Sequence, residues 1–350
     1  MIKNIHIIGS LKTGGVEKVI ETLFSTNAYS NHFFLVLDKK NNNDISLPRN
    51  TKIKYCNEKI FNFIINLLNS DYDIYNFWLH PSIITSLLIF LKRRKIIWHI
   101  HNSNINPKFL GFKNFIFACI NSLCSHFVPN KIIFCSLYSM QCHKNFFFSE
   151  KKFLMIRNPI LKNKIIQKKN YNFSAPLKFV MVANFTKAKN FKKLFEIISH
   201  VYRYNFILDI YGYGVHDNKY LKKLISKYYL NKSVNLMNFT KTDNLYHKYD
   251  YKFLVSNTES SPMTIVESII SNTPCLCSDV SDLKNIYKNN IYIIPNKIND
   301  DFINHINNLY DLRKNITQYK SLCSSSKAKV EKIHRLDLIS KRYSYLWSKI

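Results

Sequence analysis

The segment from Tyr251 to Asp279 constrains the fold of this chain more than any other stretch. Residues 253–256 are a short apolar run typical of a buried strand, and residues 263–271 carry apolar side chains at helical spacing. The sequence TPCLCSD that follows has the character of a further strand. A strand, a helix and a second strand in this order are typical of a parallel sheet covered by helices.

The loop before this helix has the chemistry of an anion site. We expect Ser261 to cap the helix through its hydroxyl and Pro262 to occupy the first helical position, where a missing N–H costs nothing. The first free amides then belong to Met263 and Thr264. Because a helix N-terminus carries unpaired N–H groups and roughly half a positive charge, this turn can bind a phosphate without a basic side chain.

Two glutamates lie on either side of this predicted anion site. Glu259 precedes it in the loop, and Glu267 lies further along the helix, where a carboxylate could accept two sugar hydroxyls. Together these features predict a site for a nucleotide-linked sugar. Two glutamates at this spacing also arise by chance, as one loop and one helix-surface residue.

Glu259, seven intervening residues and Glu267 resemble the donor-site motif of retaining glycosyltransferases of the GT-B fold. This large family includes sucrose synthase and many bacterial polysaccharide transferases. The resemblance implies that Glu259 lies near the transferred sugar and that Glu267 binds the ribose of the nucleotide. Ser260 stands where the family usually has glycine.

The composition is that of a folded, strongly basic protein. The chain has 350 residues, of which 46% are hydrophobic, and a formal net charge of +29. This length allows two domains, and the charge predicts an anionic partner such as nucleic acid, an acidic membrane surface or a phosphorylated substrate. No stretch reaches the roughly 18 apolar residues of a membrane helix. The eight cysteines form no CxxC pair, so we expect reduced core residues.

A strand, a glycine loop and a helix open the chain. Residues 2–8 have a strand pattern, and Gly14 and Gly15 precede a helix with one apolar face. Without Cβ atoms here, a ligand phosphate could approach the backbone closely, although a tight turn would also explain two glycines. The spacing matches neither the GxGxxG fingerprint nor a Walker P-loop. Gly14 to Glu17 resemble the Gly-Gly-any-Glu segment of the same glycosyltransferases.

Residues 95–101, KIIWHIH, predict a strand that ends in two histidines, His99 and His101, followed by Asn102. Ligands bind at the carboxyl ends of strands in open α/β sheets, so chemistry is expected here, although a single histidine is more often structural. The segment resembles the His-any-His-Asn sequence of bacterial family members. This implies that His101 contacts the acceptor and the transferred sugar.

A second series of strands and helices begins at residue 177. The loop ANFTKAKN leads into a helix that Asn190 is expected to cap. The family binds the donor diphosphate here with an Arg and, five residues later, a Lys. Lys189 matches the Lys, although it could also be one of many surface cations. Asn184 stands at the Arg position, where it could donate a hydrogen bond instead.

Two further segments have a distinctive composition. Residues 108–150 are aromatic, apolar and punctuated by lysines, which suits a region lying on an anionic membrane surface, although a domain interior would explain many of these side chains. Residues 161–175 are polar and without periodicity, which indicates a linker between domains.

These patterns and the resemblance predict an α/β protein of the GT-B fold, with two Rossmann-like domains whose parallel sheets face each other across a cleft. The expected domains are 1–165, which would bind the acceptor, and 170–332, which would bind the nucleotide sugar. Residues 333–350 would form a C-terminal helix that crosses back to the first domain.

The predicted function is that of a retaining, metal-independent glycosyltransferase of the hexosyltransferase type. His101, Glu259 and Lys189 would be catalytic. No cofactor or metal is expected beyond the donor, a nucleoside diphosphate sugar with UDP favoured, because Asp71-Tyr72-Asp73 imitates a GT-A metal motif but leads into a strand. The donor would be bound by the following residues: Gly14, Gly15, Asn184, Lys189, Pro262, Met263, Thr264 and Glu267.

The acceptor would be a glycan, carried on a lipid diphosphate, in lipopolysaccharide, O-antigen or capsule biosynthesis. The strand pattern begins directly after Met1, which leaves no room for a signal peptide. We therefore expect a cytoplasmic protein, associated peripherally with the inner face of the plasma membrane. Two alternatives stay open: a basic nucleic-acid-binding protein, for which no recognition motif is found, and a non-catalytic relative of the fold.

Overall fold

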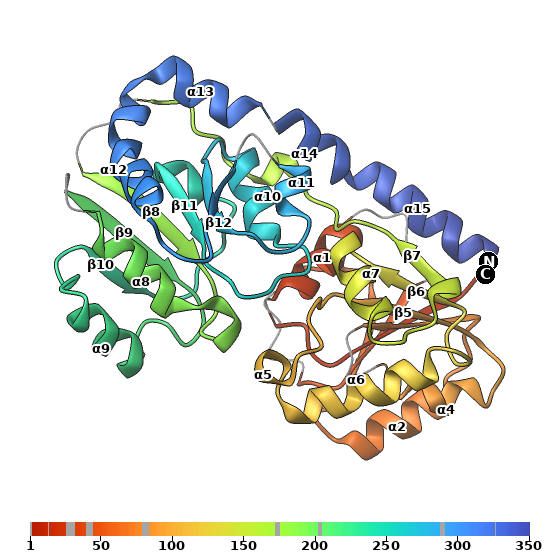
Figure 1. Cartoon of the computed structure of the whole chain (residues 1–350). Helices are drawn as coiled ribbons and strands as arrows, with labels where there is room; N and C mark the ends of the chain where they lie inside the picture. Colours follow the sequence, from red (N-terminus) through yellow and green to blue (C-terminus); the bar gives the residue numbers. More distant parts are fainter. Residues whose placement is uncertain are drawn as a thin grey trace. The chain divides into compact units, whose positions relative to one another are not determined.

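The computed structural model describes residues 2–12, 14–25, 32–39, 45–78, 83, 85–171, 176–201, 205–287, 291–325 and 327–350. The chain divides into two compact units, each built on one parallel sheet (Figure 1). Unit 1 comprises Met1–Ile160 and His334–Ile350, and unit 2 comprises Leu161–Ile333. The prediction of two parallel, Rossmann-like sheets is confirmed.

The sheet of unit 1 has seven strands in the order β3-β2-β1-β4-β5-β6-β7, and every neighbouring pair is parallel. The strand order reverses between β1 and β4, which makes this the topological switch point where ligands of open α/β sheets bind. The strands are β1 (Asn4–Ile8), β2 (His32–Val36), β3 (Lys52–Tyr55), β4 (Ile74–Trp78), β5 (Lys95–Ile100), β6 (Lys131–Phe134) and β7 (Phe153–Met155).

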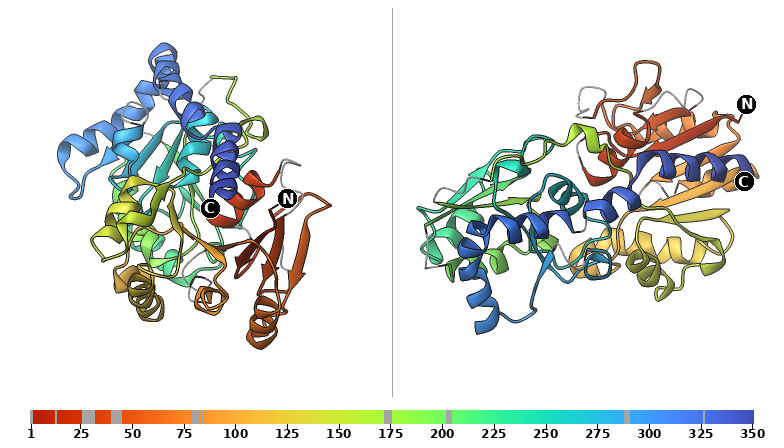
Figure 2. Two further views of the ribbon diagram at one scale, coloured as in Figure 1. Left: turned by 90° about the vertical axis from the view of Figure 1, so that its right-hand side faces the viewer. Right: turned by 90° about the horizontal axis from the view of Figure 1, so that it is seen from above.

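Helices cover both faces of this sheet. One apolar core joins α2, α4 and α6 to Phe77 and Trp98 of the strands. The other joins α1 and α15 to Phe34 and Trp78, so the last helix of the chain returns to lie beside the first (Figure 2). The helices are α1 (Gly15–Leu23), α2 (Ile60–Leu68), α4 (Ser86–Phe90), α5 (Pro107–Leu110), α6 (Phe112–Cys124), α7 (Leu137–Lys144) and α15 (Leu336–Lys349).

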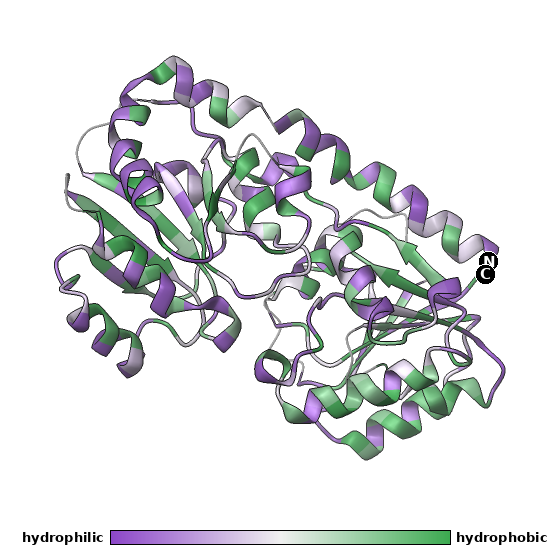
Figure 3. Cartoon of the chain, in the orientation of Figure 1, coloured by the Kyte–Doolittle hydropathy of each residue, from purple (hydrophilic) through white to green (hydrophobic). Residues whose placement is uncertain are grey.

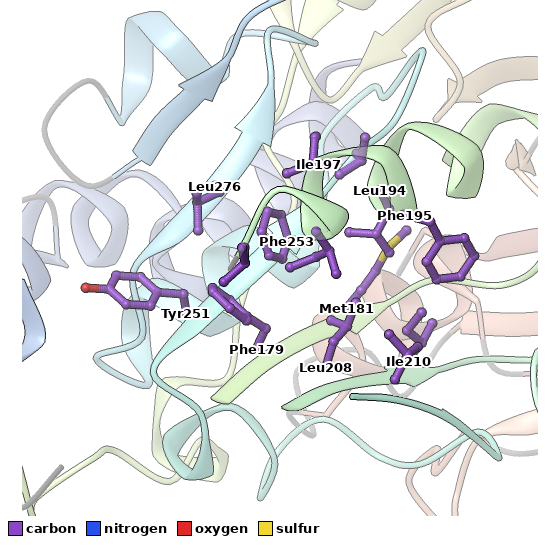
Figure 4. Close-up of a cluster of buried hydrophobic side chains, with 14 of the residues drawn as sticks. Phe179, Met181, Leu194, Phe195, Ile197, Leu208, Ile210, Tyr251, Phe253 and Leu276 are labelled. Carbon is purple, nitrogen blue, oxygen red and sulfur yellow. The ribbon is translucent and has the colours of Figure 1, made fainter. Parts of the chain in front are cut away.

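The sheet of unit 2 has six parallel strands in the order β10-β9-β8-β11-β12-β13. Its switch point lies between β8 and β11. Inward side chains of β8, β9 and β11 pack against α8 in a dense core (Figure 4). The strands are β8 (Leu177–Val182), β9 (Phe206–Tyr211), β10 (Val234–Met237), β11 (Tyr251–Leu254), β12 (Cys275–Ser278) and β13 (Ile291–Ile294). The helices are α8 (Phe191–Ser199), α9 (Lys219–Lys227), α10 (Met263–Ile270), α11 (Leu283–Ile286), α12 (Asp300–Lys314), α13 (Ile316–Ser324) and α14 (Lys327–Ile333).

Residues 161–171, which the sequence indicated as a linker, pack onto unit 2. The Ser271 hydroxyl donates to the carbonyl of Ile166 at 2.8 Å, and the Lys168 ammonium is buried against the carbonyl of Tyr249. Burial lowers the pKa of Lys168 to about 8. The segment looked unstructured because its few buried side chains follow no helical or strand period. The eight cysteines, all within the described residues, form no disulfide, and six of them are buried.

Candidate active site

The predicted catalytic residues of unit 2 meet at its switch point. Lys189 follows β8 and Glu259 follows β11, and these strands are neighbours in the sheet. The Lys189 Nζ donates to Glu259 Oε1 at 2.5 Å, and the Ser256 hydroxyl donates to the same oxygen at 2.7 Å. The pair is partly shielded from water, with side chains 24% and 13% exposed, so its attraction is screened less than that of a surface pair.

The two loops are tied together independently of this ion pair. The Asn257 amide N–H donates to the carbonyl of Ala188 at 2.7 Å, and the Asn190 side chain donates to Asn257 Oδ1 at 3.1 Å. Asn190 adopts a left-handed conformation and caps α8 by accepting from the Lys193 amide at 3.4 Å, which confirms the predicted cap. The positions of Lys189 and Glu259 are therefore fixed by backbone contacts as well as by charge.

The start of α10 differs from the prediction. Pro262 is the N-cap residue, in extended conformation, and its carbonyl accepts from Ile265 at 3.0 Å. The predicted Ser261 cap is wrong, because the helix begins one residue later than expected and no side chain caps it. The amides of Met263 and Thr264 thus open the helix without a side-chain cap, directly after the Glu259 loop.

Glu267 is buried, with 2% of its surface exposed. The Tyr246 hydroxyl donates to its Oε2 at a long 3.4 Å. Burial, with Glu267 nearby, raises the pKa of Tyr246 well above its ordinary value. The second glutamate of the motif therefore lies inside unit 2, in contact with a tyrosine that the sequence did not single out.

Asn184 forms a hydrogen bond with the neighbouring turn at Tyr213. Its Oδ1 accepts from the Tyr213 amide at 3.1 Å, and the Tyr213 carbonyl accepts from Phe185 at 2.9 Å. The turn lies so close that a Cβ on Gly212 would be 2.1 Å from the carbonyl oxygen of Ala183. The Tyr213 ring stacks on Phe239 at 4.4 Å between centroids. The side-chain oxygen of Asn184 is thus committed to the backbone, and no arginine stands at this place.

Ser260 does not strain the loop. It is absent from the residues with positive φ in the described chain, so the glycine usual in the family is not required here for backbone conformation. Its carbonyl accepts from the Ser281 hydroxyl. The loop is therefore compatible with a side chain at this position.

In unit 1, Gly14 and Gly15 open α1 directly after β1, at the switch point of that sheet. The carboxylate of Glu17 folds back over Gly14, so that a Cβ on Gly14 would lie 2.3 Å from Glu17 Oε2. Burial raises the pKa of Glu17 to about 7. The amide end of α1 is thus faced by a carboxylate from its own first turn, whereas Gly15 has open space beside it.

His99 and His101 stack on Trp78 from the same face of β5, at 3.8 and 5.5 Å between ring centroids. His99 is fully buried and its Nε2 donates to Asn76 Oδ1 at 3.1 Å, so it is part of the core rather than at the surface. His101 lies just beyond the strand end and is half-buried. Burial lowers the pKa of His101 to about 4, so its imidazole is neutral at pH 7.

Several buried polar groups on the strands of both sheets are not predicted from the sequence. In unit 1 the Trp78 indole donates to His6 Nδ1 at 3.1 Å, so His6 Nε2 carries the proton and donates to His32 Nδ1 at 2.7 Å. In unit 2, Lys252 is fully buried on β11, and burial lowers its pKa. Each lies in a strand that is otherwise mostly apolar, which gives the sequence no motif to find.

Asp71 and Asp73, which imitate a metal-binding motif, make contacts within unit 1. Asp71 pairs with Arg94, and Asp73 accepts from the Lys3 amide at 2.8 Å. Within the described ranges, no three His, Cys, Asp or Glu side chains are grouped as metal ligands would be. No helix in the described part of the chain is long and apolar enough to cross a membrane.

Comparison with known proteins shows a common fold and a family match in part of the chain. Residues 162–321 match the family described as glycosyl transferases group 1. HepE from Anabaena, solved with UDP and glucose, is similar over 100% of both chains, with 13% identity and a TM-score of 0.83. Sucrose-phosphate synthase from Thermosynechococcus elongatus has 12% identity over 99% of this chain and 98% of its own, with a TM-score of 0.79.

A further structure, the lipopolysaccharide outer core galactosyltransferase WaaB, has 19% identity over 99% of this chain and 100% of its own, with a TM-score of 0.71. No curated protein sequence matches the chain. At these identities the structural likeness establishes the GT-B fold. The match to the group 1 glycosyltransferases lies in unit 2, at residues 162–321, and both parallel-sheet units share the GT-B fold of these structures.

Proposed function

We propose that the protein transfers a sugar from a UDP-sugar to a hydroxyl of a glycan acceptor, with retention at the anomeric carbon. The observation that carries this proposal is the Lys189–Glu259 pair at the switch point of unit 2, beside the uncapped start of α10. UDP is supported by the structures of HepE, which were solved with UDP, with UDP and glucose, and with UDP-glucose.

The costly event in such a transfer is departure of the diphosphate, which leaves negative charge on an oxygen. Lys189 and the first amides of α10, those of Met263 and Thr264, would stabilise that charge, an effect worth about 3–4 kcal/mol for a single well-placed donor. Glu259 would face the transferred sugar and its developing positive charge. These groups suffice without a metal ion, so we propose a metal-independent reaction.

Glu267 would bind the ribose. Its long bond to Tyr246 is weak enough for a ribose hydroxyl to replace. Asn184 would act indirectly, by fixing the Tyr213 turn next to the donor. The stacked pair of Tyr213 and Phe239 offers a flat aromatic surface close to the proposed nucleotide site.

Unit 1, our proposed acceptor domain, would contribute His101, Gly14 and Gly15. Because the His101 imidazole is neutral at pH 7, it can both donate and accept a hydrogen bond from sugar hydroxyls. A Cβ added to Gly15 would meet no atom within 4 Å, which leaves room for a ligand at the backbone.

We further propose that unit 1 lies on an anionic membrane, where a lipid-linked acceptor would be found. Helices α2, α4 and α6 cover one face of its sheet, and α2 and α6 are largely hydrophobic in sequence (Figure 3). Full burial of one such side chain is worth about 1.5–3 kcal/mol. The large exposed apolar residues here are Ile60, Phe61, Ile65, Leu68, Phe90, Leu91, Phe112, Ile116, Leu123 and Phe127.

Basic residues accompany this apolar face. Lys92 to Lys95, four cations in sequence, follow α4, and Lys108 and Lys113 lie on α5 and α6. Apolar side chains flanked by cations suit the surface of an anionic bilayer. The similarity of fold to WaaB, a lipopolysaccharide transferase, supports a role in lipopolysaccharide, O-antigen or capsule assembly.

The donor is tested by calorimetric titration of UDP, GDP and ADP, followed by assays of sugar transfer and donor hydrolysis with matched UDP-sugars. We expect UDP to bind at least tenfold more tightly than the other nucleotides and the activity to persist in EDTA. Absence of binding by all three nucleotides, or tighter binding of GDP or ADP, would contradict the proposal.

The membrane face is tested by sedimentation with phosphatidylcholine vesicles that contain 0 or about 30% phosphatidylglycerol. We expect binding to the anionic vesicles, and a loss of at least tenfold in the Phe61→Ser/Leu123→Ser variant. Tyr229→Ser, in unit 2, removes a side chain that is 93% exposed and serves as the control. Equal loss in both variants, or no binding by the parent, would exclude this face.

A further inference from the structure

The carboxamide of Asn102, immediately after His101, has no hydrogen-bond partner in the protein. Both Oδ1 and Nδ2 are shielded from solvent, and neither makes a hydrogen bond. Buried polar side-chain atoms are paired in the large majority of cases, because an unpaired buried group destabilises the fold. Asn102 carries two such groups, one donor and one acceptor, at the carboxyl end of β5.

Asn76, on the neighbouring strand β4, shows what a structural asparagine looks like in this unit. It is fully buried, and its Oδ1 accepts from His99 at 3.1 Å and from the Trp347 indole at 3.0 Å. Its Nδ2 donates to the carbonyl of Ile5 at 3.3 Å. Both polar atoms of Asn76 are thus used by the fold, whereas neither of those of Asn102 is.

The backbone of Asn102 is nevertheless fixed. The Ser139 hydroxyl donates to its carbonyl at 2.7 Å, and the Ser139 amide donates to the hydroxyl of Ser136, the cap of α7. The position of the side chain is therefore set by α7, while its polar atoms stay unused. Such an arrangement stabilises neither β5 nor α7 through the carboxamide.

We propose that Asn102 is a sugar-binding residue, whose Oδ1 accepts from one hydroxyl of a sugar ring and whose Nδ2 donates to the oxygen of another. An amide presents a donor and an acceptor side by side, which matches a pair of neighbouring hydroxyls. The half-buried ring of His101, stacked on Trp78, lies next to it in sequence and supplies an apolar surface for the sugar. This inference rests on the proposed function, and it adds a residue that recognises the acceptor.

The first test compares Asn102→Leu with Asn76→Leu by thermal unfolding. Leucine has a similar volume and removes both polar atoms. Asn76→Leu should lower the Tm by about 5 °C or more, because it leaves His99, Trp347 and Ile5 without partners. Asn102→Leu should leave the Tm within about 1 °C of the parent or raise it. A fall in Tm similar to that of Asn76→Leu would overturn the proposal, because it would mean that the fold uses the carboxamide.

The second test measures binding of methyl glucosides and methyl galactosides, of both anomers, by saturation-transfer NMR on the full chain. At least one should bind the parent, and Asn102→Leu should weaken that binding about tenfold or more, while UDP affinity is unchanged. The proposal is overturned if the parent binds none of these glycosides or if the variant binds as well as the parent. Failure of the parent to bind UDP would instead contradict the proposed donor and leave the glycoside result interpretable.

Discussion

The two strand-end regions of this molecule differ in how their polar groups are paired. At the switch point of unit 2, Lys189 and Ser256 both donate to Glu259. At the end of β5 in unit 1, the Asn102 carboxamide has no partner, and neither does the Nδ1 of His99. These polar groups of unit 2 find their partners within the protein, whereas those of unit 1 do not.

This difference has a physical reason. A charged group left unpaired in a partly buried loop is far more expensive than a neutral amide. A site that handles a diphosphate therefore gains from charges that already hold one another in place, because they need no reorganisation when the ligand binds. A site for neutral hydroxyls can leave an amide unpaired at a smaller cost and gain specificity for its ligand.

The largest effect should come from breaking the paired site. Glu259→Gln and Lys189→Ala should each reduce kcat about 10²–10³-fold, and the double variant should lose much less than the product of the two, because each side chain positions the other. Lys187→Ala, in the same short helical turn, is the matched control and should retain most of the activity. If the double variant lost as much kcat as the product of the two single losses, the two side chains would act independently and the idea of a paired site would be wrong.

Acid should destabilise unit 1 more than unit 2. Burial lowers the pKa of His32 and of His334 to about 4 from an ordinary 6.5. As the pH falls, the unfolded state therefore binds protons at these histidines before the folded state does. Their contribution to the stability of unit 1 is complete above pH 6.5 and is lost as the pH falls toward 4, by about 3 kcal/mol for each fully buried histidine.

Hydrogen exchange at pH 7.5 and 4.5, corrected for the intrinsic rates, measures this directly. Peptides from β1, β2 and β4 should lose protection at low pH more than peptides from β8 and β11. His216→Phe, which removes an exposed histidine of unit 2, should change nothing. Equal loss of protection in both sheets would show that the buried histidines are not responsible.

A smaller effect is expected from Glu17. Its pKa is raised to about 7 from 4.5, so its contribution to stability is full below pH 4.5 and is lost as the pH rises through 7. Glu17→Gln should therefore increase the free energy of unfolding at pH 8 by about 1–2 kcal/mol, allowing for partial exposure to solvent. Urea unfolding at pH 5 and pH 8 measures it, with Glu21→Gln on the same helix as the control. A gain that is equal at both pH values would argue against a buried carboxyl.

The smallest effect belongs to Ser260→Gly. Because Ser260 already has negative φ, restoring the usual glycine relieves no strain and adds conformational freedom to the unfolded chain, for a loss of about 0.5–1 kcal/mol. Activity should stay within about twofold of the parent. A large rise in kcat would show that the side chain obstructs the donor site.

Much of the fold could be predicted from the sequence, because buried parallel strands are continuous apolar runs. The patterns predict strands over residues 2–8 and 95–101, and the structure has β1 (Asn4–Ile8) and β5 (Lys95–Ile100) there. The boundary between the units was harder, because residues 161–171 pack onto unit 2 through scattered contacts such as Ile166 with Ser271.

The candidate site likewise contains residues that the sequence can identify and residues that it cannot. Glu259, Glu267 and Lys189 belong to a recognisable spacing, so they could be singled out. Ser256 and Tyr246 could not, because a serine that contacts Glu259 and a tyrosine that contacts Glu267 are identified only by tertiary geometry. His99 is the opposite case. Its place near the strand end suggests chemistry, but its ring is stacked on Trp78 and buried in the core.

The return of α15 to unit 1 has a consequence for biosynthesis. Unit 2 is one continuous segment of the chain, so its residues are made without interruption. Unit 1 is discontinuous, and Trp347, which donates to Asn76 in its core, is made only after the whole of unit 2. A premature stop codon just before α15 would therefore damage unit 1, most of which is synthesised before unit 2.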